Sequence, residues 1–359
     1  MAISHAGLPG IRAQVGRALD EFLGQQRGAL GDISPDLLPW LDTVTELLAG
    51  GKRLRPAFCY WGWRAAGGED CPQILAAAAA LELLHASALV HDDLIDASDT
   101  RRGQASAHRR FSSRHAERGW RGPSDSFGAG AAILIGDLLL AWTDELLHAS
   151  GLPQAALRRA QPVLDAMRGE LICGQYLDLL GQAAGNGTVD SALRVVRYKS
   201  AKYTVERPLQ LGAALADPPA GTGPQIAAAC TGYGIPVGVA FQLRDDVLGV
   251  FGDPALTGKS ASDDLREGKR TVLVAIARQR ADPVGRELLD RRLGDRLLDE
   301  AGADEIRSVL TGTGALAECE LMIEASVAEA LAALADAPMN GQAKLALAEL
   351  AVIATVRSE

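Results

Sequence analysis

Apolar residues recur at intervals of three and four along almost the whole chain, which is the spacing of an amphipathic helix. The clearest case is a helix predicted over 74–98, where the apolar positions fall on one side. The alternation of apolar and polar residues that marks a half-buried strand is not sustained over any segment. The sequence therefore predicts an all-α protein, with further helices over 154–180, 189–216, 224–250 and 271–359.

Two polar segments interrupt the helical pattern. Residues 111–130 are rich in Ser, Gly and Arg, and residues 252–268 combine Gly with charged side chains, so both are predicted to be loops. The sequence shows neither an internal repeat nor a change of composition that would divide it. One domain over 1–359 is therefore expected, with the helices after 271 only completing the fold.

Composition limits the possible locations and binding partners of the protein. The most apolar run, 131–142, is too short to span a bilayer and contains Asp137, so we expect a buried core helix and no transmembrane segment. The first residues lack the apolar core of a signal peptide. The five cysteines form no CxxC pair, which suggests neither a zinc site nor a disulfide framework and fits a cytoplasmic protein. A net charge of -9 argues against nucleic-acid binding.

An acidic cluster, HDDLIDASDTRRG, is the first candidate site. Asp92 and Asp96 lie one helical turn apart, with Asp93 beside them. Like charges at this spacing repel each other by a few tenths of a kcal/mol. A divalent cation between them would turn repulsion into attraction, and carboxylate oxygens suit Mg²⁺. Taken alone, the motif could equally be a solvated acidic face of a helix.

A second acidic cluster, FQLRDDVLGVFGD, contains Asp245 and Asp246, with Gln242 within one helical turn. The loop that follows carries Lys259 and Lys269 among glycines. A polyphosphate leaving group needs this combination, because metal ions bridge its oxygens and lysines neutralise the charge that develops. By itself the loop could be a solvated surface turn.

Further basic residues could bind the same kind of anion. Lys52 and Arg55 stand three apart at a glycine-led helix start, GGKRLRP. His85 lies two turns before the first acidic cluster on about the same helix face, although a lone helical His is more often a core residue. Arg101 and Arg102 are adjacent and point in different directions, so they could serve two phosphate groups.

Together these motifs resemble the trans-isoprenyl diphosphate synthases, the polyprenyl synthetase family. The resemblance covers 50–271 in the family's order, through GGKRLRP, LELLHASALVHDDLIDASDTRRG, GQYLDL, RYKSAKY, FQLRDDVLG, GK and GKRT. It implies an isoprenoid synthase-type helical bundle around a central apolar cavity, with the two acidic clusters facing each other across its mouth. It also implies a homodimer.

The resemblance implies a head-to-tail (1'-4) condensation of isopentenyl diphosphate with dimethylallyl, geranyl or farnesyl diphosphate. The allylic diphosphate would ionise with the help of three Mg²⁺ ions. The double bond of isopentenyl diphosphate would attack the allylic cation, and diphosphate would take up the proton that is lost. Such chemistry rests on electrostatics and positioning, without a covalent nucleophile.

The resemblance also assigns site residues. The carboxylates implied as metal ligands are Asp92, Asp93, Asp96, Asp245 and Asp246. The residues implied to hold the allylic diphosphate are Arg101, Lys199 and Lys259. Those implied to bind isopentenyl diphosphate are Lys52, Arg55, His85 and Arg102. Lys269 matches a position at the rim of the site, and Gln242 and Ser200 match polar positions near the allylic carbon, Ser200 in place of the more usual Thr.

One departure concerns the second acidic cluster. Gly249 stands where many members of the family have a third Asp, so the third metal ion is expected to be bound more weakly. Asp253 follows four residues later, and the sequence does not assign it the missing role.

Product length is implied to depend on the floor of the cavity. Ser87 and Ala88, five and four positions before Asp92, are small, whereas bulky residues at these places stop chain growth early in the family. Leu84 and Leu81 could form a deeper floor. We therefore expect geranylgeranyl diphosphate (C20), with farnesyl diphosphate (C15) or a longer chain as alternatives.

Three other classes compete with this interpretation. A class I terpene cyclase also uses DDxxD, but its second motif mixes Asn or Asp, Ser or Thr, and Glu, unlike DDVLGVFGD. His91-Asp92 suggests an HD-type phosphohydrolase, but the further His ligands of such a site are not evident. A non-catalytic subunit of a heteromeric synthase would be expected to have lost the motifs that this chain keeps.

Overall fold

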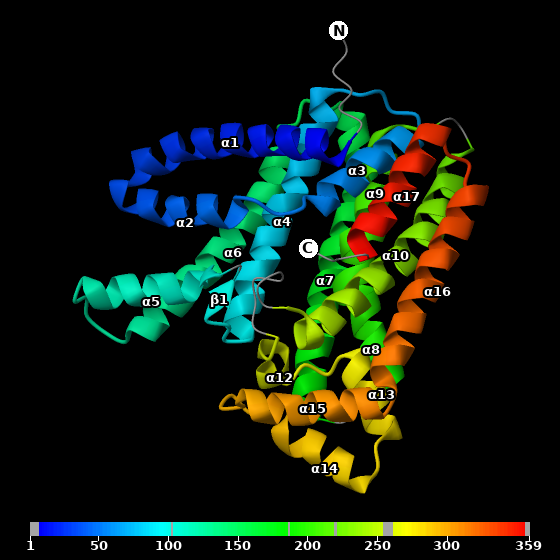
Figure 1. Ribbon diagram of the computed structural model, residues 1–359. Coiled ribbons are helices and arrows are strands. Elements are labelled where there is room, and N and C mark those ends of the chain that lie inside the picture. Colours follow the sequence, from blue (N-terminus) through cyan, green and yellow to red (C-terminus); the bar gives the residue numbers. More distant parts are fainter. Residues whose placement is uncertain (1–6, 102, 186, 219–220, 254–260, 356–359) are drawn as a thin grey trace.

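A computed structural model describes residues 7–101, 103–185, 187–218, 221–253 and 261–355. Helices make up most of it, and one short antiparallel hairpin is the only sheet among these residues. The all-α prediction is confirmed. Figure 1 labels the elements.

The N-terminal half consists of long helices interrupted by the hairpin. Its elements, in chain order, are α1 (Leu8–Ile33), η1 (Pro35–Leu37), α2 (Leu38–Leu48), α3 (Leu54–Ala65), α4 (Pro72–Ile95), β1 (Thr100–Arg101), β2 (Gln104–Ala105), α5 (Ala107–Glu117), α6 (Ser124–His148) and α7 (Gln154–Ala184).

In the described part of the C-terminal half, all regular elements are helices, and one of them, η2, is a π-helix. Its elements are α8 (Val189–Val195), η2 (Val196–Glu206), α9 (Arg207–Leu215), α10 (Gly223–Phe251), α12 (Asp263–Glu267), α13 (Val272–Arg280), α14 (Pro283–Arg292), α15 (Glu300–Gly312), α16 (Ala315–Asp336) and α17 (Gly341–Thr355).

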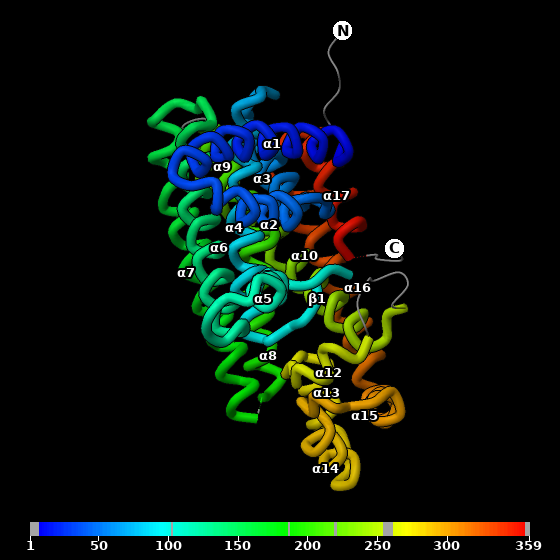
Figure 2. Tube along the Cα trace, turned by 90° about the vertical axis from the view of Figure 1, so that its left-hand side faces the viewer, coloured from blue at the N-terminus to red at the C-terminus, as the bar shows by residue number. Residues whose placement is uncertain are grey.

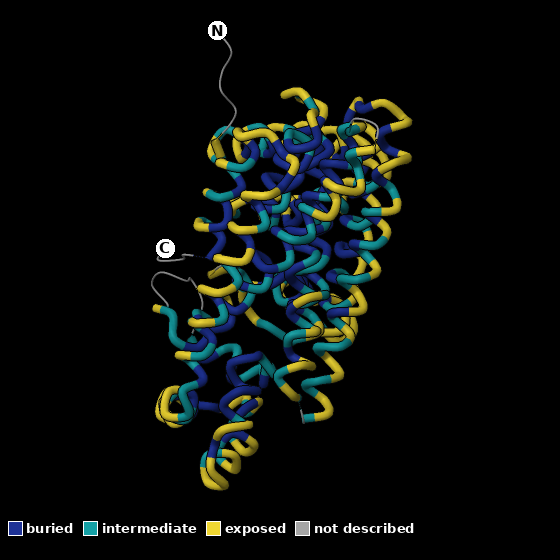
Figure 3. The backbone as a smooth tube through the Cα atoms, turned by 90° about the vertical axis from the view of Figure 1, so that its right-hand side faces the viewer, coloured by how far each residue is buried: buried dark blue, intermediate teal, exposed yellow. Residues whose placement is uncertain are grey.

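The long helices lie side by side and form a bundle. In Figures 1 and 2, α4, α6, α7, α10 and α16 follow its long axis, α1, α2 and α5 extend to one side, and α13, α14 and α15 lie at one end. The most extensive contacts join α4 to α6, α10 to α16 and to η2, and α3 to α9. Figure 3 shows that buried positions concentrate between the helices. Most of these positions are apolar, and their burial removes apolar surface from contact with water.

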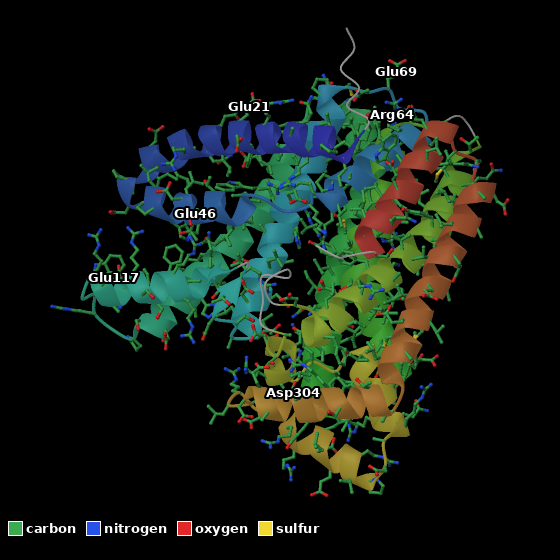
Figure 4. The ribbon with its side chains drawn as sticks, in the orientation of Figure 1. Glu21, Glu46, Arg64, Glu69, Glu117 and Asp304 are labelled. Atoms are coloured by element: carbon green, nitrogen blue, oxygen red, sulfur yellow. The ribbon has the colours of Figure 1, made fainter. Side chains whose placement is uncertain are left out.

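Two clusters of buried apolar side chains stabilise the bundle. The larger one takes in α1, α3, α4, α6, α9 and α17, and the smaller one lies between the end of α10 and α13, α15 and α16. Figure 4 shows the sticks of charged residues such as Glu21 and Asp304 on the outside. Glu46 on α2 lies toward α5 in that view and pairs with Arg110, which ties the two projecting helices together.

The helices predicted over 154–180 and 224–250 are confirmed as α7 and α10, whose apolar periodicity was unbroken. The segment 189–216 is helical, but its middle is the π-helix η2, which periodicity did not predict. The loop prediction for 252–268 is wrong at its end, because α12 forms there.

The loop predicted over 111–130 is wrong for most of its length. Helix α5 extends to Glu117 and α6 begins at Ser124, so a short turn joins the two. Phe111 and His115 are buried, and Ser112 donates a hydrogen bond of 2.7 Å to Asp125. The segment is polar on average because it is rich in Ser and Arg, and this average composition does not show that one face of α5 is apolar.

The run 131–142 is part of the longer helix α6, and the prediction that it is buried is correct for one face only. Ile135 and Leu139 are buried, but Ile133 and Leu134 are 46% and 61% exposed. By length and composition alone, the described helices α4, α6 and α10 are long and apolar enough to cross a membrane, and the expectation that none of them does so stays a prediction. The apolar window of α4 is 72% buried in the bundle, against 39% for α6.

Candidate active site

The first acidic cluster lies at the end of α4, and its partners reach it from three later elements. Asp93 is buried and accepts a hydrogen bond of 2.7 Å from Nε of Arg101 on β1. Asp92 accepts one of 2.8 Å from Nε2 of Gln175 on α7 and lies 3.4 Å from Nζ of Lys199 on η2. The π-helix and α7 therefore meet α4 at its carboxylates.

Local backbone geometry brings Arg101 back to this cluster. Helix α4 ends where the amide of Asp96 donates to the carbonyl of Asp92 (2.8 Å). Ala97 then has φ 53°, a left-handed conformation that stops the helix and costs a non-glycine residue roughly 1 kcal/mol. The β1–β2 hairpin follows at once and carries Arg101 beside the end of α4.

The carboxylates of this cluster have different electrostatic environments. Burial raises the pKa of Asp92, but the charges of Lys199 and Arg101 outweigh it and hold that pKa below its ordinary value. Burial, followed by the charge of Asp92, raises the pKa of Asp96 to about 7. A cation bound between these two carboxylates would relieve their repulsion.

The second acidic cluster lies near the end of α10. Asp245 is exposed, whereas Asp246 is buried and accepts a hydrogen bond of 2.7 Å from Nε2 of Gln242. Burial raises the pKa of Asp246 to about 8 despite that hydrogen bond. The two neighbouring carboxylates therefore differ in their access to a ligand.

Helix α12 adds to the second cluster an acid, Asp264, to which the sequence assigned no role. A β-carbon at Gly249 would lie 1.9 Å from Oδ2 of Asp264, so the Asp264 carboxylate lies in the space that a side chain at Gly249 would fill. Nζ of Lys269 donates to Oδ1 of Asp264 (2.7 Å) and lies 2.8 Å from Glu267. The one sequence signal was the glycine in place of a third Asp.

A hydrogen bond joins the two clusters across the site. The hydroxyl of Ser98, within the first cluster, donates to Oε1 of Glu267 on α12 (2.9 Å). The charge of Lys269 also lowers the pKa values of Asp92 and Asp96. Helix α12, which also places Asp264 beside Gly249 of α10, is thus held close to the end of α4.

A second group of predicted residues meets at Tyr203 on η2. Nη2 of Arg55 donates to Thr204 (2.9 Å), and its guanidinium lies 4.3 Å from the centre of the Tyr203 ring. Nδ1 of His85 lies 3.3 Å from the Tyr203 hydroxyl. Lys52 is exposed just before α3. Arg55 and His85 therefore meet at the π-helix, where a second anion could bind.

Some site residues were missed or lie outside the description. Gln175 and Asp178 on α7 bond Asp92 and Lys199, although the motif GQYLDL that contains them gave no hint of their role. Arg102 and Lys259 lie outside the described residues.

Two glycines allow the π-helix to approach α7 and α10 closely. A β-carbon at Gly174 would lie 2.5 Å from the backbone nitrogen of Lys199, and one at Gly238 would lie 2.4 Å from the α-carbon of Ala201. Side chains at either position would push η2 away. The glycines therefore fix the depth at which Lys199 and the buried Ser200 lie in the bundle.

An ion-pair cluster fixes the other side of η2. Glu170 on α7 accepts two hydrogen bonds of 2.7 Å from Arg207, and it also pairs with Lys202. Burial raises the pKa of Glu170, but the hydrogen bonds from Arg207 and Lys202 outweigh it and hold the pKa below the ordinary value of 4.5. The cluster links α7 to the end of the π-helix.

We expect Glu170→Gln to lower the Tm at neutral pH. We also expect the Tm of the variant to fall less steeply than that of the wild type as the pH is lowered. A carboxyl group whose pKa is lowered by folding stabilises the folded state at pH values above its pKa in the unfolded chain. That stabilisation is lost as the pH falls through the pKa that the group has in the folded protein. The difference in Tm between wild type and variant should therefore shrink below about pH 4.5. Asp190→Asn, at an exposed i,i+4 pair with Arg194, should change Tm little at any pH. A Tm difference for Glu170→Gln that is constant from pH 7 to pH 3 would contradict the assignment.

A cavity of about 290 Å³ lies beneath the first acidic cluster, between α4, α6 and α7. Its lining includes Leu84, Ser87 and Ala88 of α4, three of the four residues expected at the floor. Leu81 is buried in the core and is not among the lining residues. Asp92 lines it near the upper end, one turn before Ile95, so one helix carries both a carboxylate and much of the apolar wall.

The donor set fits magnesium bound together with a polyanionic substrate. Among the described residues, no three acidic, His or Cys side chains converge into a complete metal site. Mg²⁺ seldom uses such a cage, because it takes one or two carboxylates and completes its shell with water and substrate phosphates. Asp92, Asp96 and Asp245 would supply the carboxylates. The charge of Asp92, which adds to burial in raising the pKa of Asp96, is one that a bound cation would offset.

Comparison with known proteins gives a consistent result. Residues 39–310 match the polyprenyl synthetase family. The fold resembles a Corynebacterium glutamicum geranylgeranyl pyrophosphate synthase complexed with isoprenyl diphosphate and magnesium, with a TM-score of 0.92, 39% identity, and coverage of 96% of this chain and 98% of that one. A geranylgeranyl diphosphate synthase of Mycobacterium tuberculosis is 30% identical over 91% of this chain and 87% of its own length. A geranylfarnesyl diphosphate synthase of Aeropyrum pernix is 33% identical, over 79% and 82%.

Proposed function

Since this chain belongs to the polyprenyl synthetase family and is a prenyltransferase, we propose that it makes geranylgeranyl diphosphate from isopentenyl diphosphate and an allylic diphosphate, with Mg²⁺. The observation that carries the proposal is the pair of acidic clusters, joined through Ser98 and Glu267 above an apolar cavity. A substrate with a polyanionic head and a hydrocarbon tail matches both parts of such a site.

The proposed mechanism needs binding and positioning by the chain's own residues. Mg²⁺ held by the carboxylates would supply positive charge that favours departure of the allylic diphosphate. Lys199, Arg101 and Lys269 would hold its oxygens, since each already contacts an acid of the site. Arg55 and His85 would hold the second diphosphate, so that the double bond of isopentenyl diphosphate faces the allylic carbon. The apolar cavity keeps water from the cation, and the departed diphosphate takes the proton.

The small side chains of Ser87 and Ala88 in the cavity wall support a C20 product over farnesyl diphosphate. Both lie about one helical turn below Asp92, where bulk would block the growing chain. The named relatives make products of different lengths, so relatedness alone does not decide between C20 and a longer chain.

We also propose one domain, a homodimer and a cytoplasmic location. The dimer is supported by apolar side chains exposed on adjoining helices, Ile133 and Leu134 on α6 and Ile172 and Tyr176 on α7. Exposed apolar surface of this kind is typical of an interface.

The direct test is incubation of the purified protein with Mg²⁺, isopentenyl diphosphate and, in separate reactions, dimethylallyl, geranyl and farnesyl diphosphate. Chromatography of the dephosphorylated products should show C20 as the main alcohol. Failure to elongate any primer would refute the synthase; a main product of C15 or C25 would refute only the proposed length.

Restoring the family's third aspartate is expected to impair this protein. In Gly249→Asp the new β-carbon would displace the Asp264 carboxylate and strain its contact with Lys269. We expect kcat/KM to fall by about tenfold or more in steady-state assays, since small displacements at a site carry costs of this order. The double variant Gly249→Asp/Asp264→Gly should recover part of the loss. A rise in activity for the single variant would show that Asp264 does not act in place of the missing residue.

A further inference from the structure

A charged pair lies at the deep end of the cavity. Helices α4 and α7 run in the same direction with α6 antiparallel to both (Figures 1 and 2). The Gln175–Asp92 hydrogen bond, about one turn inside the outermost lining residues Ile95 and Leu179, is taken as the level of the mouth. Seven residues before Gln175 on α7 is Arg168, and eight before Asp92 on α4 is Leu84, and both line the cavity. At 1.5 Å per residue they lie about 10–12 Å below the mouth.

Arg168 bridges from α7 to α6 at that depth. Its Nη2 donates to Oδ1 of Asp144 at 2.7 Å, and Asp144 lies one helical turn beyond Leu140, which lines the cavity from α6. The Arg168 side chain is only 16% exposed, and its Nε is buried without a hydrogen-bond partner in the described part of the chain. The guanidinium therefore lies at a level of the cavity where the neighbouring lining residues, Leu84, Leu140 and Leu171, are apolar.

This arrangement opposes further growth of a hydrocarbon chain. A terminus that reached Arg168 would have to displace the ion pair or bury the guanidinium against methyl groups, and uncompensated burial of charge is costly. An apolar floor such as Leu84 alone would only pack against the chain. Charge thus adds to the steric limit at this level of the cavity.

We propose that the Arg168–Asp144 ion pair sets the maximum product length of this enzyme. The inference rests on the proposed function, because it assigns specificity within the same cavity. Arg168 acts here as a specificity-determining residue that contacts the end of the grown chain and takes no part in ionisation or condensation.

The test compares product distributions of Arg168→Ala, Asp144→Asn and wild type with farnesyl diphosphate as primer. We expect the ratio of products longer than the wild-type main product to rise about tenfold or more in Arg168→Ala, since a single methylene in an apolar pocket already gives discrimination of this size. Asp144→Asn, whose side chain is 42% exposed, preserves shape and should shift the ratio in the same direction. The Asp144→Asn variant therefore tests the role of the ion pair in product length even if Arg168→Ala folds poorly.

Arg159→Ala is the matched control. Arg159 lies on the same helix, lies 3.6 Å from Asp217 and is not among the cavity-lining residues, so its loss should leave the ratio unchanged. A wild-type ratio in folded, active Arg168→Ala and Asp144→Asn would overturn the inference, as would equal lengthening in Arg159→Ala. Wild-type protein that elongates no primer would instead refute the proposed function itself.

Discussion

Asp92→Ala is expected to abolish detectable turnover, a fall in kcat of about a thousandfold or more, while the helical fold persists. The substitution removes a proposed metal ligand and the acceptor of the Gln175 hydrogen bond. Losing one preorganised electrostatic group in an active site costs about a hundred- to a thousandfold, and losing a metal ligand adds to this. The fold should survive because Lys199 keeps its 2.6 Å contact with Asp178. Product formation is followed with excess Mg²⁺, and the helical content by circular dichroism.

Asp99→Ala provides the control. Asp99 belongs to the same acidic segment but is 71% exposed and pairs with Arg109. Its replacement should leave kcat within about twofold of wild type, as expected for an exposed ion pair. Full activity of Asp92→Ala under the same conditions would refute the metal assignment and leave the acidic cluster as a surface feature.

The second large effect is expected for Gly174→Ala, a change of one methyl group. The new β-carbon would lie 2.5–2.8 Å from backbone atoms of Lys199 and Tyr198, and backbone cannot swing aside as a side chain can. Overpacking of this kind costs about 1–3 kcal/mol of unfolding free energy. Because the π-helix carries Lys199, a shift of about 1 Å should also lower kcat/KM by about a hundredfold. Urea unfolding and steady-state kinetics measure the two effects.

Gly169→Ala is the matched comparison within α7. A β-carbon there meets nothing within 4 Å, so the substitution should stabilise the helix by up to about 1 kcal/mol and leave kcat/KM unchanged. If Gly174→Ala behaves like Gly169→Ala, the close approach of η2 to α7 does not control the position of Lys199.

Helix positions could be predicted where one apolar face is continuous. α7 and α10 are 31 and 29 residues long, so their periodicity dominates over any local polar residue. The elements that escaped prediction are short or irregular. α12 has five residues, and β1 and β2 have two each. The π-helix, with its i→i+5 hydrogen bonds, covers only 11 residues, too few for its different periodicity to stand out from the flanking α-helical pattern.

The candidate site was predictable only in part. The spacing of Asp92 and Asp96 could be recognised because one helical turn carries both. Asp264, Glu267 and Arg168 could not, because each meets a partner on another element through packing that periodicity does not encode. The roles of the predicted ligands stay predictions until the variants above are measured.

The arrangement of Gly249 and Asp264 has a consequence for protein engineering. The carboxylate beside the second acidic cluster is carried by α12, not by α10. A designer who grafted the segment from Phe241 to Asp253 into another scaffold would transfer the helix without that acid. The transferable unit must extend through Lys269, since the lysine fixes the carboxylate. In this chain the acids of the second cluster come from two helices, so the segment that carries all of them is longer than the motif recognised in the sequence.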